Sequence, residues 1–239
     1  MTDPLPDVRP DIPPEATSDA PRRNLYGRSR GKSLRPAQAE RLERGLAERS
    51  IPGVTRADNP SRSPIAAPAP LWLEIGFGGG EHLVHMARSY PEVTLWGAEP
   101  YVNGMAQALG HLEATPAPNV RLLMGDARDL LEVLPEGALQ KAFLLYPDPW
   151  PKLRHQRRRF VSPEPLALLA RALAPGGEFR VATDIEDYVR QALEEAPRAG
   201  FVLERGPTGE AWSDWIRTRY EAKALREGRT PSYLTFRRP

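Results

Sequence analysis

Short apolar runs alternate with amphipathic stretches from residue 71 onward. Runs of strand length lie at 71–75, 93–99, 120–125, 138–146, 177–183 and 231–238. Stretches with helical periodicity lie between or after them, at 81–90, 103–113, 126–134, 164–174 and 185–196. Strands that are almost continuously apolar and alternate with helices predict a parallel sheet covered on both faces. We therefore expect an α/β fold with a doubly wound, mostly parallel sheet of about seven strands, the last supplied by 231–238.

The chain before this pattern divides into two zones. Residues 1–21 are rich in proline and acidic side chains and have no apolar periodicity, so we expect a disordered tail. Residues 22–63 are rich in basic side chains and contain a short predicted helix with Pro36 in its first turn. The sequence thus predicts a basic N-terminal arm over 22–63 and one main domain over 64–239.

Composition narrows the classes of function. The chain has no cysteine, which excludes disulfides, cysteine nucleophiles and thiolate metal sites. His82, His85 and His111 lie in predicted helices without the spacing of metal ligands, so we expect no metal. No signal peptide and no run near ~18 apolar residues is found, so we expect a cytoplasmic protein without a membrane span. The formal net charge is only +2, so a nucleic-acid site would have to arise from local basic clusters.

A glycine-rich turn follows the first predicted strand. The segment EIGFGGG runs from Glu74 through Gly76 and Gly78 to a predicted helix that starts at Glu81. Glycines let the backbone turn tightly and approach a ligand closely. A dinucleotide-binding fingerprint needs glycine at position 81, and the carboxylate of Glu81 would face a pyrophosphate unfavourably. The turn alone is also compatible with a strand-to-helix connection that binds nothing.

Carboxylates stand at the ends of the second and third predicted strands. Glu99 can accept hydrogen bonds from both ribose hydroxyls of a nucleoside. Asp126, followed by Ala127, can join the same pocket or simply cap the next helix. With the glycine turn, these residues predict a nucleoside pocket, which a nucleotide cofactor and S-adenosylmethionine would fit equally well.

The fourth predicted strand ends in the segment YPDPWPK. Its three prolines fix the backbone and cannot continue a ladder, so we expect a rigid loop that carries Asp148, Trp150 and Lys152. A basic run from Arg154 to Arg159 follows. Such a run is often only a solvated face, but its place beside the predicted site favours phosphate binding. Trp150 can stack on a base or fill the core, and we favour the core.

Several of these segments resemble one known family. The segments EIGFGGGEHLVHMA, GDAR, PDPWPKLRHQRRRF, the pair Thr183-Asp184 and the segment TRYE at Thr218–Glu221 resemble the bacterial tRNA (guanine-N7-)-methyltransferases, in order over about residues 24–236. The resemblance implies the Rossmann-like fold of class I S-adenosylmethionine-dependent methyltransferases. It also implies S-adenosylmethionine as cofactor, tRNA as partner, and guanine 46 of the variable loop as target. For the protein itself we expect a monomer or a homodimer.

The resemblance also implies roles for individual residues. It places Asp148 at the active site and implies cofactor contacts at Glu74, Gly76, Gly78, Glu99, Asp126, Ala127 and Asp148. It implies substrate contacts at Lys152, Asp184, Thr218, Arg219, Tyr220 and Glu221. RNA contacts are implied at Arg154, His155, Gln156, Arg157, Arg158 and Arg159. Leu153 departs from the family pattern, since many members carry a basic or small residue there, and would weaken one phosphate contact.

The chemistry of guanine N7 agrees with these residue types. N7 is an unprotonated nitrogen with an available lone pair, so its methylation needs no general base. Positive charge appears on the purine, and the carboxylates of Asp148, Asp184 and Glu221 are our candidates to stabilise it. Two rivals remain: a small-molecule methyltransferase, which has no use for the basic run, and a non-catalytic RNA-binding module, which would not bind S-adenosylmethionine.

One helix is predicted near residue 220. We expect Thr218 and Glu221, three residues apart, to share a face of it. We also expect Trp212 and Trp215 to pack the helix onto the sheet.

Overall fold

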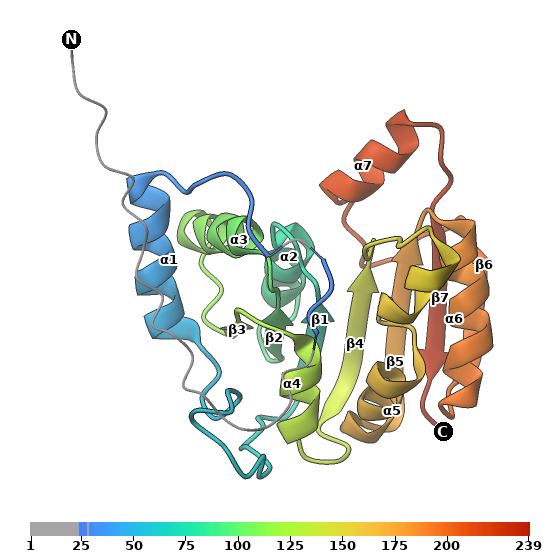
Figure 1. Ribbon diagram of the computed structural model, residues 1–239, viewed down its shortest axis with the longest axis horizontal. Coiled ribbons are helices and arrows are strands. Elements are labelled where there is room, and N and C mark those ends of the chain that lie inside the picture. The colour runs from blue at the N-terminus through green and yellow to red at the C-terminus, as the bar shows by residue number, and fades with distance from the viewer. Residues whose placement is uncertain (1–23, 28) are drawn as a thin grey trace.

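The computed structural model describes residues 24–27 and 29–239. Its seven strands are β1 (Leu71–Ile75), β2 (Thr94–Ala98), β3 (Val120–Leu123), β4 (Leu139–Leu145), β5 (Leu173–Thr183), β6 (Val202–Thr208) and β7 (Ser232–Arg237). They form one sheet in the order β3-β2-β1-β4-β5-β7-β6 (Figure 1). Strands β1 to β5 pair in parallel, whereas β7 pairs antiparallel with both β5 and β6. The predicted doubly wound, mostly parallel seven-stranded sheet is confirmed.

Helices cover both faces of the sheet. They are α1 (Pro36–Arg49), α2 (Glu81–Ser89), α3 (Val102–Ala114), α4 (Ala127–Val133), α5 (Pro163–Ala172), α6 (Glu186–Arg198), α7 (Arg219–Arg226) and the 3-10 helix η1 (Leu153–Arg158). One apolar cluster joins α4, α5 and α6 to the sheet, and a second joins α2 and α3 to its other face. Figure 1 shows α7 beyond the carboxyl end of β4, away from both layers.

The strand order reverses between β1 and β4, which pair with each other at the centre of the sheet. Chains leaving β1 and β4 pass to opposite faces, so their carboxyl ends leave a crevice between them. Leu73 of β1 and Phe143 of β4 are fully buried and anchor the strands on opposite faces of the sheet. A fully buried leucine or phenylalanine contributes about 1.5 to 3 kcal/mol of transfer free energy. The crevice is therefore built on a fully buried part of the sheet.

The basic arm packs on the main domain. Helix α1 begins at the predicted Pro36 and places Leu42 against α3. After it, Ser50 forms a bridge with Leu122, and Ile51 is buried in the core. The segment thereby covers the β3 edge of the sheet, which would otherwise expose unpaired backbone groups. The acidic tail predicted over 1–21 lies outside the described residues.

Two features near the C-terminal side differ from the prediction. Strand β6 does not stand out in the sequence because it is a sheet edge, with Val202 and Leu203 exposed, so it lacks the apolar pattern of the inner strands. Trp212 and Trp215 lie in a loop rather than in a helix, because Thr218 caps α7 and the helix starts only at Arg219. Both indoles still pack on the sheet, edge-on to the ring of Tyr233.

Candidate active site

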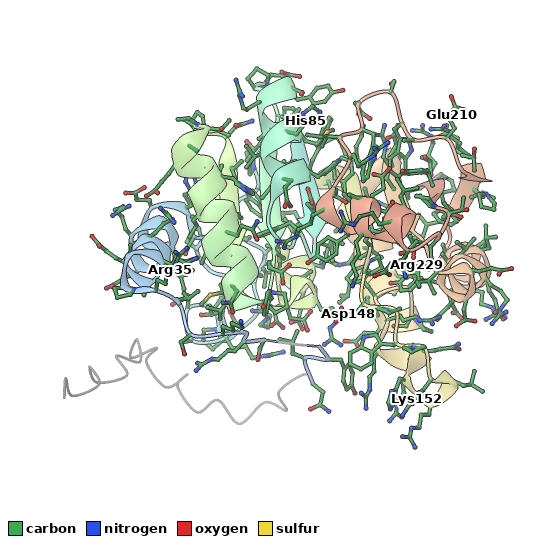
Figure 2. The ribbon with its side chains drawn as sticks, turned by 90° about the horizontal axis from the view of Figure 1, so that it is seen from above. Arg35, His85, Asp148, Lys152, Glu210 and Arg229 are labelled. Atoms are coloured by element: carbon green, nitrogen blue, oxygen red, sulfur yellow. The ribbon has the colours of Figure 1, made fainter. Side chains whose placement is uncertain are left out.

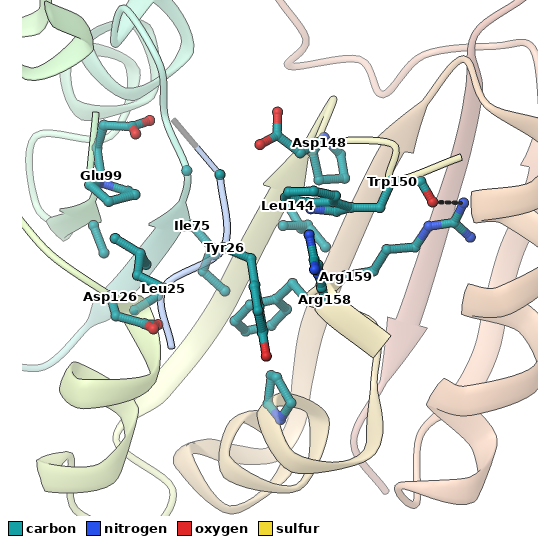
Figure 3. A pocket seen from close by; sticks show the side chains of 18 of the residues that line it. Leu25, Tyr26, Ile75, Glu99, Asp126, Leu144, Asp148, Trp150, Arg158 and Arg159 are labelled. Carbon is teal, nitrogen blue, oxygen red and sulfur yellow. Dashed lines mark hydrogen bonds between the residues drawn. The ribbon is translucent and has the colours of Figure 1, made fainter. Parts of the chain in front are cut away.

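A cavity of about 900 Å³ opens at the carboxyl ends of the central strands. That volume lies at the upper end of the range for small-molecule sites. Figure 3 shows Glu99, Asp126 and Leu25 on one wall, and Asp148 and Trp150 on the opposite wall. Segments far apart in the sequence thus meet at the predicted switch point.

The glycine turn and Glu99 form one wall. Backbone N–H groups of Gly78 and Tyr101 donate to the two Glu99 carboxylate oxygens, at 2.6 and 2.8 Å. Burial raises the pKa of Glu99 to about 7, although these two hydrogen bonds oppose the rise. Gly76 has φ +68°, and a Cβ added there would meet no protein atom within 4 Å. The backbone at Gly76 therefore faces open space that a ligand can occupy.

Asp126 lies on the same wall and also caps a helix. Its side chain accepts from the backbone N–H of Arg128 at 2.9 Å and pairs with the Arg128 guanidinium at 2.5 Å. Ala127, the next residue, lines the cavity as well. Both interpretations of Asp126, pocket residue and helix cap, therefore apply at once.

Glu74 has a different environment from the other predicted cofactor residues. Its carboxylate is buried and accepts from His82 Nδ1 at 2.8 Å, and it is not among the residues that line the cavity. A buried carboxylate needs such a partner, because an unpaired charge inside a protein is costly. In this structure the buried contact between Glu74 and His82 joins β1 to α2, the two elements that the glycine turn connects.

The proline loop forms the opposite wall. Asp148 is exposed and lines the cavity between Pro147 and Pro149. Tyr146 and Trp150, on either side, have φ values of +49° and +40°. Left-handed backbone at residues other than glycine costs about 1 to 2 kcal/mol each, so the loop is strained on both sides of Asp148.

Trp150 lies at the cavity wall and does not fill the core as we had favoured. It is half-buried, and its ring meets Tyr26 edge-on, with centroids 6.4 Å apart. The Arg158 guanidinium lies 4.9 Å from the ring centres of both Trp150 and Tyr26. An aromatic surface bordered by a cation is suited to contact a base or a cofactor ring.

The basic run divides into outward and inward side chains. Arg154 and Arg157 are exposed on η1, and Lys152 is exposed just before it, where Figure 2 shows it at the outer rim of the molecule. His155, Gln156 and Arg158 are half-buried, and Gln156 donates to Asp187 Oδ2 at 2.6 Å. The side chain of Arg159 is fully buried and pairs with Asp187 at 2.7 Å. The predicted RNA contact at Arg159 therefore has no exposed group to make it.

The predicted substrate residues near the C-terminus also divide into residues that line the cavity and residues that are buried behind it. Arg219 and Tyr220 line the cavity, with the guanidinium 5.0 Å from the ring centre. Thr218 and Glu221 are buried behind them, where Thr218 accepts from the Glu221 backbone N–H at 3.2 Å as the cap of α7. The predicted shared helical face is thus a capping contact.

Two of the three predicted carboxylates, Glu221 and Asp184, do not line the cavity. Glu221 accepts from Tyr233 Oη at 2.9 Å and from Trp215 Nε1 at 2.6 Å. Asp184 forms an ion pair with Arg229. Asp148 is the carboxylate of the three that lines the cavity.

The N-terminal arm supplies a wall that the sequence analysis missed. Leu25, Tyr26 and Gly27 line the cavity. Gly27 has φ +119°, and a Cβ there would lie 3.0 Å from Asp148 Oδ2. Arg128 Nη2 donates to the Asn24 carbonyl at 3.0 Å and anchors the segment across the opening. The signal was an apolar and aromatic pair, Leu25 and Tyr26, inside an otherwise basic stretch.

Residues 24–27 and 29–239 lack two kinds of structural feature. No cluster of three or more histidine and acidic side chains that could hold a metal ion occurs in those ranges. No helix in that part of the chain is both long and apolar enough to cross a membrane.

Known proteins with similar sequences share one activity in their names. A family model described as "Putative methyltransferase" matches residues 68–233. The tRNA (guanine-N(7)-)-methyltransferase of Paracoccus denitrificans (strain Pd 1222) is 56% identical over 231 residues, which cover 94% of this chain and 98% of that protein. The protein of the same name from Ruegeria sp. (strain TM1040) is 58% identical over 237 residues, with 96% and 93% covered.

Solved structures are similar in fold. The 16S rRNA methyltransferase KamB matches 80% of this chain and 100% of its own, with a TM-score of 0.53 and 18% identity. A protein titled as an antibiotic-related methyltransferase matches 80% and 97%, with a TM-score of 0.55 and 16% identity. At such identities the likeness concerns the architecture alone.

Proposed function

The chain belongs to the tRNA (guanine-N(7)-)-methyltransferase family, and from this premise we propose that it methylates N7 of guanine 46 in the variable loop of tRNA, with S-adenosylmethionine as methyl donor. One observation carries the proposal at the level of the site. Asp148 and Glu99 face the same cavity, and a run of exposed cations begins four residues after Asp148, at Lys152, and continues into η1. Asp148 is also close enough that its negative charge adds to the rise in the pKa of Glu99.

The cofactor wall fits a nucleoside. Each Glu99 oxygen accepts one backbone hydrogen bond, and a carboxylate oxygen has a second lone pair to offer a ribose hydroxyl. Gly76 leaves open space beside this carboxylate, and Asp126 and Ala127 extend the wall. When bound, S-adenosylmethionine supplies a methyl group on a positively charged sulfur.

The protein's own contribution is to position guanine and to stabilise charge. N7 attacks with its own lone pair, so no side chain has to remove a proton. Positive charge then grows on the purine, and a carboxylate fixed nearby lowers the free energy of that state. We assign this role to Asp148, because it lines the cavity, whereas Asp184 and Glu221 do not. Much of the remaining rate enhancement comes from holding the two reactants in line.

The RNA is held by the rim of the cavity. Lys152, Arg154 and Arg157 present exposed charge to phosphates. Arg219 and Tyr220 lie across the cavity as contacts for the target nucleotide. Action in the cytoplasm, and a monomer or homodimer as the working form, stay predictions.

Mapping the methylated nucleotide tests the proposal directly. The protein is incubated with tRNA and labelled S-adenosylmethionine, and a transcript with adenine in place of guanine 46 serves as the control. We expect 7-methylguanine at position 46 and no label in the control. Label at another nucleotide, or label in the adenine transcript, would contradict the assignment. Near-normal single-turnover transfer by Asp148→Ala would remove Asp148 from the mechanism.

A further inference from the structure

Arg159 is an arginine of the basic run that lies inside the protein. Its side chain is 0% exposed. Nε donates to the Pro149 carbonyl at 2.8 Å, and Nη2 approaches the Trp150 carbonyl at 3.4 Å (Figure 3). These two carbonyls belong to the loop that immediately follows Asp148. The guanidinium therefore holds the loop by its backbone.

The other side of the guanidinium is fixed to helix α6. Nη2 pairs with Asp187 Oδ2 at 2.7 Å, and Nη1 donates to Gln191 Oε1 at 2.9 Å. The same interaction holds the pKa of the Asp187 carboxyl below its usual range. Gln191 is held in turn, because its amide donates to the Val161 carbonyl at 2.8 Å. The planar guanidinium thus links the loop to a rigid helix with fixed geometry.

The loop needs such a link because its backbone is strained. Trp150 has φ +40°, and strained conformations persist only where the surroundings hold them. At the start of the loop, the Tyr146 backbone N–H donates to the Ala182 carbonyl at 2.7 Å. At its end, the contacts of Arg159 take the same role. Asp148 lies between these two anchors.

We propose that Arg159 is a positioning residue that fixes the Pro149–Trp150 backbone and so holds the Asp148 carboxylate at the cavity wall. Arg159 borders the cavity, but its side chain is 0% exposed, so it offers no surface to tRNA or cofactor and acts through the loop. The inference rests on the proposed function, since it concerns the same methyl transfer. It separates Arg159 from its neighbour Arg157, which is exposed and serves binding.

The experiment compares binding with chemistry in the full-length protein. Arg159→Ala and Arg159→Lys are tested for tRNA affinity and for the single-turnover rate at saturating tRNA and S-adenosylmethionine. The rate is normalised to the sites that bind S-adenosylmethionine, so that loss of folded protein is not counted as loss of chemistry. We expect the rate to fall by about tenfold to a hundredfold, because a small misplacement of a reacting group costs that much. tRNA affinity is expected to change less than about twofold, whereas Arg157→Ala should lose affinity.

Two further measurements separate positioning from mere stability. Added guanidinium ion at low concentration should restore part of the rate to Arg159→Ala and none to Asp148→Ala. Arg159→Lys keeps the positive charge but lacks the planar set of N–H donors of the guanidinium, so its single-turnover rate should remain low. Should Arg159→Ala fail to fold, Asp187→Asn replaces it, since it removes the ionic partner and should also slow the rate.

The possible failures are distinct. A wild-type protein that methylates no guanine N7 in tRNA would overturn the proposed function. A wild-type protein that does so, together with Arg159 variants at full rate per cofactor site, would overturn this inference alone. Loss of tRNA affinity with an unchanged rate in Arg159→Ala would instead make Arg159 a binding residue.

Discussion

Replacing Lys152, Arg154 and Arg157 together with alanine is expected to change how tRNA binding responds to salt. All three side chains are exposed on or beside η1, and Arg157 also borders the cavity that Glu99 lines. Cations that neutralise phosphates release condensed counterions, so affinity falls with salt in proportion to the number of contacts. The triple variant should therefore bind more weakly and with a shallower salt dependence.

The size of the effect follows from the number of exposed cations. Each phosphate contact contributes about 0.7 to 0.9 to the slope of log affinity against log salt, so three contribute about 2 to 3. Between about 50 and 200 mM salt, the wild type should then lose roughly 20 to 40 times more affinity than the variant. Arg159 is excluded from this count because its side chain is fully buried.

The assay is fluorescence anisotropy of labelled tRNA at four salt concentrations, with S-adenosylhomocysteine present to prevent turnover. Arg198→Ala is the matched control, since Arg198 is exposed but stands at the far end of α6, paired with Glu194 and Glu195. It should keep the wild-type slope. A triple variant with the same slope as the wild type would show that the η1 cations are only a solvated face.

Three further changes test other parts of the site. Burial raises the pKa of Glu99 to about 7, so its carboxyl is mostly protonated at pH 6 and ionised at pH 8. The apparent Kd for S-adenosylmethionine, measured by calorimetry, should therefore rise about tenfold from pH 8 to pH 6. Glu99→Gln should bind S-adenosylmethionine weakly, and its Kd should not depend on pH in this range. Gly27→Ala puts a Cβ 3.0 Å from Asp148 Oδ2 at a left-handed φ. Single-turnover methyl transfer should therefore slow, while the melting temperature stays within about 2 °C of the wild type. An unchanged rate would contradict the role of the N-terminal segment as a wall of the cavity. Tyr233→Phe removes one hydrogen bond from the buried Glu221 carboxylate and should cost about 1 to 3 kcal/mol in urea unfolding, whereas no loss would mean that Glu221 finds another partner.

The sheet could be predicted because its inner strands are buried on both faces. Strands of that kind leave apolar runs in the sequence, and the rule that ligands bind at their carboxyl ends directs attention to Glu99, Asp126 and Asp148. Strand β6 shows no such run because it is an edge. The local sequence pattern therefore predicts a strand wherever both faces of that strand are buried.

The rest of the site depends on contacts between residues far apart in the chain. Nothing local distinguishes Arg159 from Arg157, because they differ only in the partner that folding brings to them, Asp187 for the first and solvent for the second. The segment with Leu25 and Tyr26 likewise gains its place from distant residues, because Arg128 binds the Asn24 carbonyl and Trp150 packs on Tyr26. A sequence lists the chemical groups, whereas only the tertiary structure tells which of them face the cavity.

The ion pair between the buried Arg159 and the half-buried Asp187 also has a consequence for how the protein can change over generations. Losing Asp187 leaves the fully buried Arg159 guanidinium without its carboxylate partner, which costs several kcal/mol, whereas Asp187 is 29% exposed and keeps Arg190 as a second partner. Effects of substitutions at such contacts do not add, so an acceptable replacement has to alter both residues and the hydrogen bonds of Gln191 together. Arg154 and Arg157 are free of this restriction, because each makes its contribution separately at the surface. We therefore expect the inward arginine to be inherited with its partners as one unit, while the outward ones vary singly.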